Sequence, residues 1–317
     1  MKVAIFGSSG LLGSAVAGEV SKRGYECLRF SRRGSPTDWQ NLHSEALPLE
    51  NKEKVTRRML DLWPDSIVNC AAVSSPVAVK ADPAGAHITN VEGARNLAEI
   101  ASHLGARYIH LSTDMVFDGT SYRYRSTDQP NPLNEYGRQK LEAEKLVLSA
   151  MEENVVVLRI TLLNGNSPEG KRSPHEKILN ALATGDPLTL FSDEFRQPCS
   201  SQNVASVILE LLERSNLNGL FHWAGKEKIS RYDLGIRILR RFGFNENAVV
   251  KRSLQENPGL SGPRPSHLSF ELSPLQGKLK TEPTTIQEQL NELIVPHHLY
   301  QWYRENADDP SKYLPRF

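Results

Sequence analysis

The feature that most constrains the fold of this chain is a glycine-rich turn within its first thirteen residues. An apolar run at residues 3–6 ends at Gly7, and glycine then recurs at Gly10 and Gly13. A helical pattern starts directly after the turn and continues to residue 23, and Gly24 can end it. A short buried strand that turns through glycine into a helix is typical of the opening unit of a parallel α/β sheet.

Strand and helix patterns then alternate throughout the first half of the chain. We expect strands at residues 26–30, 66–70, 107–111 and 155–160, and helices at residues 86–103 and 134–151. This alternation predicts an α/β fold, a doubly wound parallel sheet of the Rossmann type, over residues 1–165.

The pattern loosens beyond residue 165. Helices are expected at residues 175–183, 204–214, 231–242 and 284–293. We therefore expect residues 166–296 to form mainly a smaller C-terminal lobe, with some elements returning to the sheet. Residues 297–317 form an aromatic tail without clear periodicity, which either packs on the body of the chain or binds a protein partner.

The composition argues against several classes of protein. The formal net charge is only +1, so no large electrostatic field favours nucleic acid or an anionic membrane as a partner. No apolar stretch approaches the roughly 18 residues that span a bilayer, and the run at residues 3–6 is too short for a secretory signal. Cys27, Cys70 and Cys199 are far apart and lack metal-ligand spacing, so we expect free thiols, no metal site and a cytoplasmic location.

The glycine turn suits the pyrophosphate of a dinucleotide. The first glycine permits the sharp turn, the second permits close approach of the backbone, and the third permits tight packing of the helix on the sheet. The helix N-terminus then offers free N–H groups and a partial positive charge to the phosphates. We expect the cofactor to contact Gly7, Ser9, Gly10, Leu11, Leu12 and Gly13.

The end of the second expected strand bears on which dinucleotide is bound. NAD sites usually place a carboxylate there for the ribose hydroxyls, but this strand ends Ser31-Arg32-Arg33, and the next carboxylate is Asp38. Two guanidiniums and a hydroxyl suit the 2′-phosphate of NADP. We therefore expect NADP, and NAD stays open because the two arginines could simply be solvated at the surface.

A second group of residues suits proton transfer beside the cofactor. Tyr136 and Lys140 are four residues apart on an expected helix and share one face, and Thr113 ends the strand before it. An ammonium about 4 Å from a phenol would favour the phenolate by roughly 4 kcal/mol, or about three pKa units, at an effective dielectric of 20. This arrangement predicts that Tyr136 is a general acid with a lowered pKa. The alternative is a surface pair that matches by chance.

These residues and their neighbours resemble those of a known family. Residues 112–119 (STDMVFDG) and 132–137 (PLNEYG), followed by Lys140, make the chain similar to an extended short-chain dehydrogenase/reductase, specifically the dTDP-4-dehydrorhamnose reductase group. The resemblance implies that Thr113, Tyr136 and Lys140 are catalytic. It also implies that the cofactor contacts Asn69, Ala71, Ala72, Tyr136 and Lys140.

The implied function is an NADP(H)-dependent reductase of a keto group on a nucleotide-linked sugar, with residues 166–296 as the substrate lobe. Dimers are common in that family, so a homodimer is open. The substrate half departs from the family pattern in three places: residues 75–79 (SPVAV) replace an Asp-Lys pair, residues 159–165 (RITLLNG) replace a tryptophan-containing run, and His267 replaces an asparagine.

The chain also resembles the regulatory β-subunit of methionine adenosyltransferase, which shares this fold. The similarity is close at residues 219–225 (GLFHWAG), in the arginine pair after the second strand and around Arg264. It implies an alternative function, a non-catalytic regulatory subunit that binds NADP. In that case the tail, with Tyr300, Trp302 and Tyr303, is the natural docking element for a protein partner.

Overall fold

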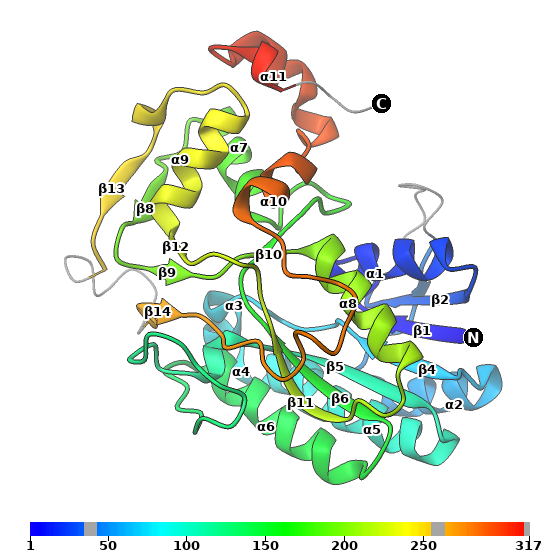
Figure 1. The fold of residues 1–317 in the computed structure, drawn as a ribbon. Coiled ribbons are helices and arrows are strands. Elements are labelled where there is room, and N and C mark those ends of the chain that lie inside the picture. The colour runs from blue at the N-terminus through cyan, green and yellow to red at the C-terminus, as the bar shows by residue number, and fades with distance from the viewer. Residues whose placement is uncertain (35–42, 255–263, 314–317) are drawn as a thin grey trace.

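The structure, a computed structural model, describes residues 1–34, 43–254 and 264–313. Its centre is a seven-stranded sheet of order β11-β6-β5-β4-β1-β2-β3, in which every neighbouring pair is parallel (Figure 1). The strands are β1 Lys2–Phe6, β2 Glu26–Ser31, β3 Glu45–Ala46, β4 Ser66–Asn69, β5 Arg107–Thr113, β6 Val155–Ile160 and β11 Gly219–Trp223. The prediction of a doubly wound parallel α/β sheet is confirmed.

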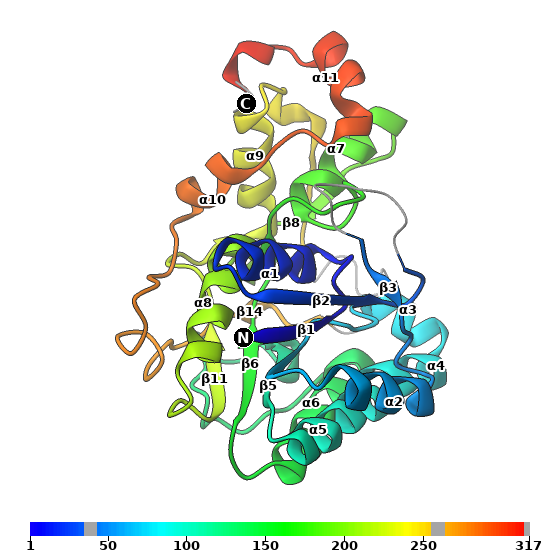
Figure 2. The ribbon, with the colours of Figure 1, turned by 90° about the vertical axis from the view of Figure 1, so that its right-hand side faces the viewer.

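Helices cover both faces of the sheet because alternate strand residues point to opposite sides. Val3 and Ile5 pack with α1 (Leu11–Lys22) and α8 (Ser201–Glu213). Ala4 and Phe6 pack on the opposite face, with α5. Figure 2 shows α1 and α5 on different sides of the sheet. The helices on that second face are α2 Lys52–Leu62, α5 Gly93–Leu104 and α6 Glu135–Ala150.

The second half of the chain builds a smaller lobe and also returns to the sheet. Every strand of the sheet except β11 comes from the first 165 residues, and α8 packs against α1. The lobe has its own apolar core. Its helices are α7 Pro174–Thr184, α9 Arg231–Arg241, α10 Ile286–Glu292 and α11 Tyr300–Asn306. Its short strands form three small sheets. In the first, β8 (Thr189–Phe191) pairs with β13 (Val250–Arg252), and in the second, β9 (Phe195–Arg196) lies between β12 (Ile229–Ser230) and β14 (His267–Leu268). In the third, β7 (Leu163–Asn164) pairs with β10 (Cys199–Ser200).

The aromatic tail packs against the chain's own lobe as far as residue 313. Tyr303 is buried edge-on to Phe242, with ring centroids 6.4 Å apart, and Trp302 stacks on Phe244 at 5.6 Å. Two of the three aromatic side chains expected to dock a partner are therefore used within the chain. Tyr300 remains exposed. Residues 314–317 lie outside the described part.

Some elements differ from the expectations. The helix expected at residues 86–103 starts earlier, as α4 (Pro83–His87), and runs through a π-helical segment at Ile88–Glu92 into α5. The helices α2, α3 (Pro76–Ala81) and α11 were not expected. All three cysteines are free thiols. Among the described helices, none combines the length and apolar character needed to cross a membrane.

Candidate functional site

A cleft opens at the carboxyl ends of the strands, where β1 and β4 are neighbours and the strand order reverses. In open α/β sheets this is the place where ligands bind. Two adjoining cavities, each of about 470 Å³, form the cleft and share Gly10, Cys70, Ala71, Ala72, Ser74, Ser75 and Arg172 in their walls. We call the cavity lined by Thr113, Tyr136 and Lys140 the inner cavity, and the one lined by Ser31 and Arg32 the outer cavity.

The glycine turn closes tightly on the end of β4. Gly7 has φ +77°, and a Cβ there would lie 2.7 Å from the Ala71 nitrogen. A Cβ on Gly13 would lie 2.2 Å from the Gly7 carbonyl oxygen. Gly10 is the N-cap of α1, and no described side chain caps this helix. Gly10 and the first turn of α1, including Leu11 and Leu12, therefore line the inner cavity with uncapped backbone N–H groups, which fits a pyrophosphate.

The outer cavity brings together part of the expected NADP-binding set. Ser9, Ser31 and Arg32 line it, whereas Arg33 is exposed and does not. The Ser31 hydroxyl also lies 2.8 Å from Ser44 Oγ. Asp38 lies outside the described residues.

A carboxylate that sequence reasoning missed lines the same cavity. Glu50 Oε1 accepts a hydrogen bond of 3.1 Å from Thr89 Oγ1. It is separated from the second strand by almost twenty residues, so no strand-end signal could identify it. A carboxylate here can accept ribose hydroxyls, so the outer cavity contains groups suited to either dinucleotide.

The loop after β4 presents Ala71 and Ala72 to both cavities, but Asn69 does not line them. Asn69 is buried; its Oδ1 accepts from the Ala71 N–H at 3.1 Å and its Nδ2 donates to Tyr108 Oη at 3.2 Å. Asn69 therefore fixes the backbone of the loop after β4 without contacting the cavities. Asn90 does the same for the next loop, because it hydrogen-bonds both the N–H and the carbonyl of Val73, at 2.8 and 3.2 Å.

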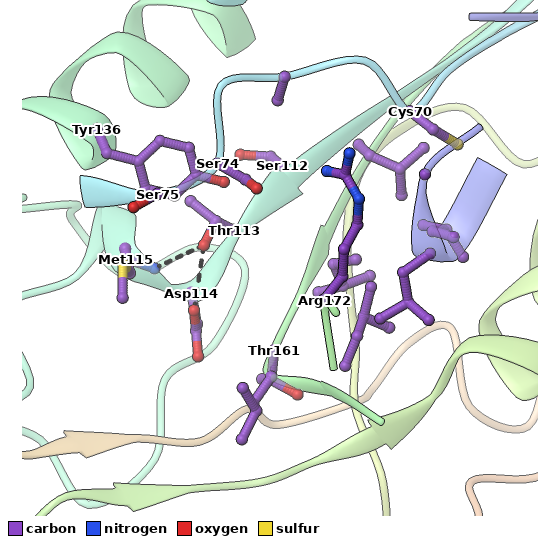
Figure 3. Close-up of a pocket in the computed structure, with 18 of the residues that line it drawn as sticks. Cys70, Ser74, Ser75, Ser112, Thr113, Asp114, Met115, Tyr136, Thr161 and Arg172 are labelled. Atoms are coloured by element: carbon purple, nitrogen blue, oxygen red, sulfur yellow. Dashed lines mark hydrogen bonds between the residues drawn. The ribbon is translucent and has the colours of Figure 1, made fainter. Parts of the chain in front are cut away.

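Thr113, Tyr136 and Lys140 line the inner cavity together, from the end of β5 and the first turns of α6. Figure 3 shows Thr113 and Tyr136. Asn134 caps α6 by accepting from the Gly137 N–H at 3.0 Å, which fixes where the helix begins. Lys140 is only 2% exposed, and its Nζ lies 3.1 Å from Nε2 of the buried His110. Burial lowers the pKa of Lys140 to about 8 and the pKa of His110 well below its usual value, so the ammonium donates to a neutral imidazole.

The structure contradicts the expected acidification of Tyr136. Burial raises the pKa of this phenol well above its ordinary value, and the Thr113 hydroxyl opposes that effect only in part. The charge that acts on Tyr136 is the carboxylate of Asp114, which raises the pKa further. The physical reason is that both groups are desolvated and that the Lys140 ammonium is directed at His110.

A buried ion pair supports these residues from behind. Glu144, one turn after Lys140 on α6, pairs with Arg159 of β6 at 2.9 and 2.7 Å, and both side chains are almost fully buried. Glu144 also accepts a hydrogen bond from Ser112 Oγ, the residue before Thr113. The pair therefore ties α6 to the ends of β5 and β6.

The smaller lobe contributes a positively charged wall to the inner cavity, which sequence reasoning missed. The cations are Lys171, Arg172, Lys177, Arg196 and Arg231, and Asp114 is the one carboxylate among the described lining residues. Burial lowers the pKa of Lys177, and the guanidiniums of Arg231 and Arg172 lower it further. Arg231 Nη1 is buried and has no hydrogen-bond partner in the part of the chain that the structure describes. These residues come from α7, α9, β9 and the loop before α7, so no local motif marks them.

The cavities do not supply a metal site from the described residues, because no group of three or more His, Cys, Asp or Glu side chains converges there.

Known proteins similar to this chain agree with this architecture. The family model for the RmlD substrate binding domain matches residues 1–298. Methionine adenosyltransferase 2 subunit beta from Bos taurus is 33% identical over 284 residues, covering 87% of this chain and 81% of that protein. The probable low-salt glycan biosynthesis reductase Agl14 of Haloferax volcanii is 28% identical over 290 residues, covering 90% and 95%.

Among solved structures, dTDP-4-dehydrorhamnose reductase from Bacillus anthracis, in complex with NADP, shares the fold with a TM-score of 0.78 at 22% identity, covering 92% of this chain and 96% of that one. The family match spans both the glycine turn and the cleft. The chain belongs to the RmlD family of extended short-chain dehydrogenases/reductases.

Proposed function

We propose that the protein is an NADP(H)-dependent reductase of a keto group on a nucleotide-linked sugar. The observation that carries this proposal is that the glycine turn and the side chains of Thr113, Tyr136 and Lys140 line one cavity. The similarity to a dTDP-4-dehydrorhamnose reductase bound to NADP and to a glycan biosynthesis reductase supports it.

The cofactor would supply a hydride to the carbonyl carbon of the substrate. Gly7, Ser9, Gly10, Leu11, Leu12 and Gly13 would hold its pyrophosphate, and Ser31 and Arg32 its 2′-phosphate, whereas Arg33, which does not line the outer cavity, would contribute only at longer range. Ala71 and Ala72 would line its path, and Asn69 would fix their backbone. Tyr136 would donate a proton to the ketone oxygen, Thr113 would polarise that oxygen, and Lys140 would bind the nicotinamide ribose.

The charge of the inner cavity supports an anionic substrate. Lys177, Arg196 and Arg231 face the cavity from the smaller lobe. Among the described residues, only Arg196 of these three forms an ion pair with a carboxylate, Glu194 at 2.9 Å. A buried guanidinium N–H without a partner, as at Arg231, is costly unless a ligand accepts from it. A diphosphate linked to a sugar supplies such acceptors.

The test is NADPH oxidation against dTDP-, GDP- and UDP-linked 4-keto sugars. Tyr136→Phe removes the proton donor and should lower turnover by about 10²–10⁴-fold while NADPH binding stays intact. Tyr122→Phe, at a tyrosine that is 76% exposed, is the matched control and should keep full activity. Unchanged turnover in Tyr136→Phe would remove Tyr136 from the mechanism.

The similarity to methionine adenosyltransferase 2 subunit beta favours a second candidate, a regulatory subunit that binds NADP and does not turn over. Because residues of the tail are buried in the lobe, truncation would disturb the core, so the full chain is the proper sample. Size-exclusion chromatography with and without a methionine adenosyltransferase, each with and without NADP, tests this candidate. Separate elution of the two proteins under all conditions would reject the regulatory function. The elution volume of the chain alone reports whether the chain is a homodimer.

A further inference from the structure

The Thr113 hydroxyl is already engaged within the protein. Its Oγ1 lies 3.1 Å from Asp114 Oδ1 and accepts a hydrogen bond of 3.2 Å from the Met115 N–H (Figure 3). A hydroxyl has one proton to donate and two lone pairs that accept. While Asp114 is a carboxylate, which only accepts, Thr113 has to donate to it. The hydroxyl then has no proton left for Tyr136, the other side chain with which it interacts, or for a ligand in the inner cavity.

Asp114 is itself in an unusual setting. It is 5% exposed, and its Oδ2 is buried without a hydrogen-bond partner among the described residues. An unpaired buried carboxylate oxygen is costly, and protonation is the simplest way to remove the cost. The same carboxyl lines the inner cavity beside Tyr136.

The charged and titratable groups around Asp114 do not cancel this cost. Arg196 of β9 favours the carboxylate, Glu194 disfavours it, and the buried thiol of Cys199 on β10 faces it as well. Burial outweighs Arg196 and the hydrogen bond from Thr113, and it raises the pKa of Asp114 from 3.8 to about 6. The carboxyl therefore changes protonation state near neutral pH.

We propose that Asp114 is a positioning residue that acts through Thr113. The protonated carboxyl donates to Thr113 Oγ1 and frees the Thr113 proton for the cavity, whereas the carboxylate keeps that proton. No bond other than O–H is made or broken, and the proton on Asp114 comes from solvent. The inference rests on the proposed function, in which the substrate ketone accepts from Thr113.

The state of the Thr113 hydroxyl depends on pH through Asp114. The donating form of Thr113 is present below pH 6 and is lost as the pH rises through about 6. The other groups of the site titrate elsewhere: burial raises the pKa of Tyr136, lowers the pKa of Lys140 only to about 8, and keeps His110 neutral. A limb near pH 6 therefore belongs to Asp114.

The first experiment is the pH profile of kcat/KM for reduction of a nucleotide-linked 4-keto sugar by NADPH, in the wild type and in Asp114→Asn. An amide can donate to Thr113 Oγ1 at any pH. We expect the wild-type profile to fall up to tenfold per pH unit above about 6, and the Asn variant to lose this limb. Asp61→Asn, at an exposed position on α2, is the charge-matched control and should keep it. A limb that persists unchanged in Asp114→Asn overturns the proposal.

A second experiment needs no substrate and separates this inference from the proposed function. Because the folded chain binds the Asp114 proton more tightly than the unfolded chain, wild-type stability relative to Asp114→Asn should fall as the pH rises through about 6. In a Thr113→Val background the Asp114 carboxylate loses the hydrogen bond from Thr113, which lowers its pKa. The fall in stability should therefore occur at a higher pH. A stability difference that does not vary with pH, or one that does not move with Thr113→Val, overturns the link even if no ketosugar is turned over.

Discussion

The buried ion pair between Glu144 and Arg159 gives the sharpest test of what holds the site together. Their side chains are 2% and 3% exposed, and two hydrogen bonds join them. Removing one partner of a buried pair leaves an uncompensated charge and typically costs about 3–5 kcal/mol, far more than breaking a surface pair. Without Glu144, the partners left to Arg159 among the described residues would be His222 Nε2, at 3.3 Å, and the Phe117 ring, 5.1 Å from its Cζ.

We therefore expect Glu144→Gln and Arg159→Met each to lower the free energy of unfolding by about 3–5 kcal/mol, measured by urea denaturation. Independent effects would sum to roughly 6–10 kcal/mol in the double variant. Because the double variant removes both charges of this pair and leaves neither without its partner, it should lose less than either single variant.

The control variant is on α6, as Glu144 is, and replaces arginine by methionine, as Arg159→Met does. Arg138→Met breaks an exposed pair with Glu135 on α6, at 2.9 Å and with side chains 55% and 39% exposed, and should cost less than about 1 kcal/mol. Two results would refute the reasoning: single variants that lose no more than this control, or a double variant that loses the full sum.

Two further predictions concern the cofactor. Gly13→Ala places a methyl group 2.2 Å from the Gly7 carbonyl oxygen and should abolish NADP binding in a fluorescence titration. Gly18→Ala, on the same helix, should bind normally, because beyond the backbone of the helix itself a methyl group there meets no described atom within 4 Å. Equal affinities would show that the turn tolerates a side chain. Arg32→Ala should weaken NADP binding at least tenfold and leave NAD binding nearly unchanged, and an equal loss for both would exclude a contact with the 2′-phosphate.

The parallel sheet was predictable because its signals are local. The strand that ends at Gly7 and the alternation of apolar runs with helical periods are read within short windows. The helix α2 was missed because most of its residues are polar or charged, and of its eleven residues only Val55 and Met59 are buried. The strand β11 was missed as a strand because it joins the sheet only through its pairing with β6, far away in sequence.

The candidate site was predictable only in part, for a similar reason. Spacing places Tyr136 and Lys140 on one face of α6, but it does not say which acceptor the ammonium meets. The buried imidazole of His110, on β5, decides that. The wall of Lys177, Arg196 and Arg231 is assembled by the tertiary fold, so no window of the sequence contains it.

The raised pKa of Tyr136 still favours one direction of the proposed reaction. Reduction of a ketone generates an alkoxide, which is a stronger base than a phenolate, so a neutral phenol can give up its proton to it. Oxidation of an alcohol would instead need the phenolate as a base, and burial disfavours that form. The buried, protonated Tyr136 is therefore suited to act as an acid at neutral pH and poorly suited to act as a base. The same desolvation that raises the pKa of Tyr136 therefore agrees with reduction, the direction of the proposed reaction.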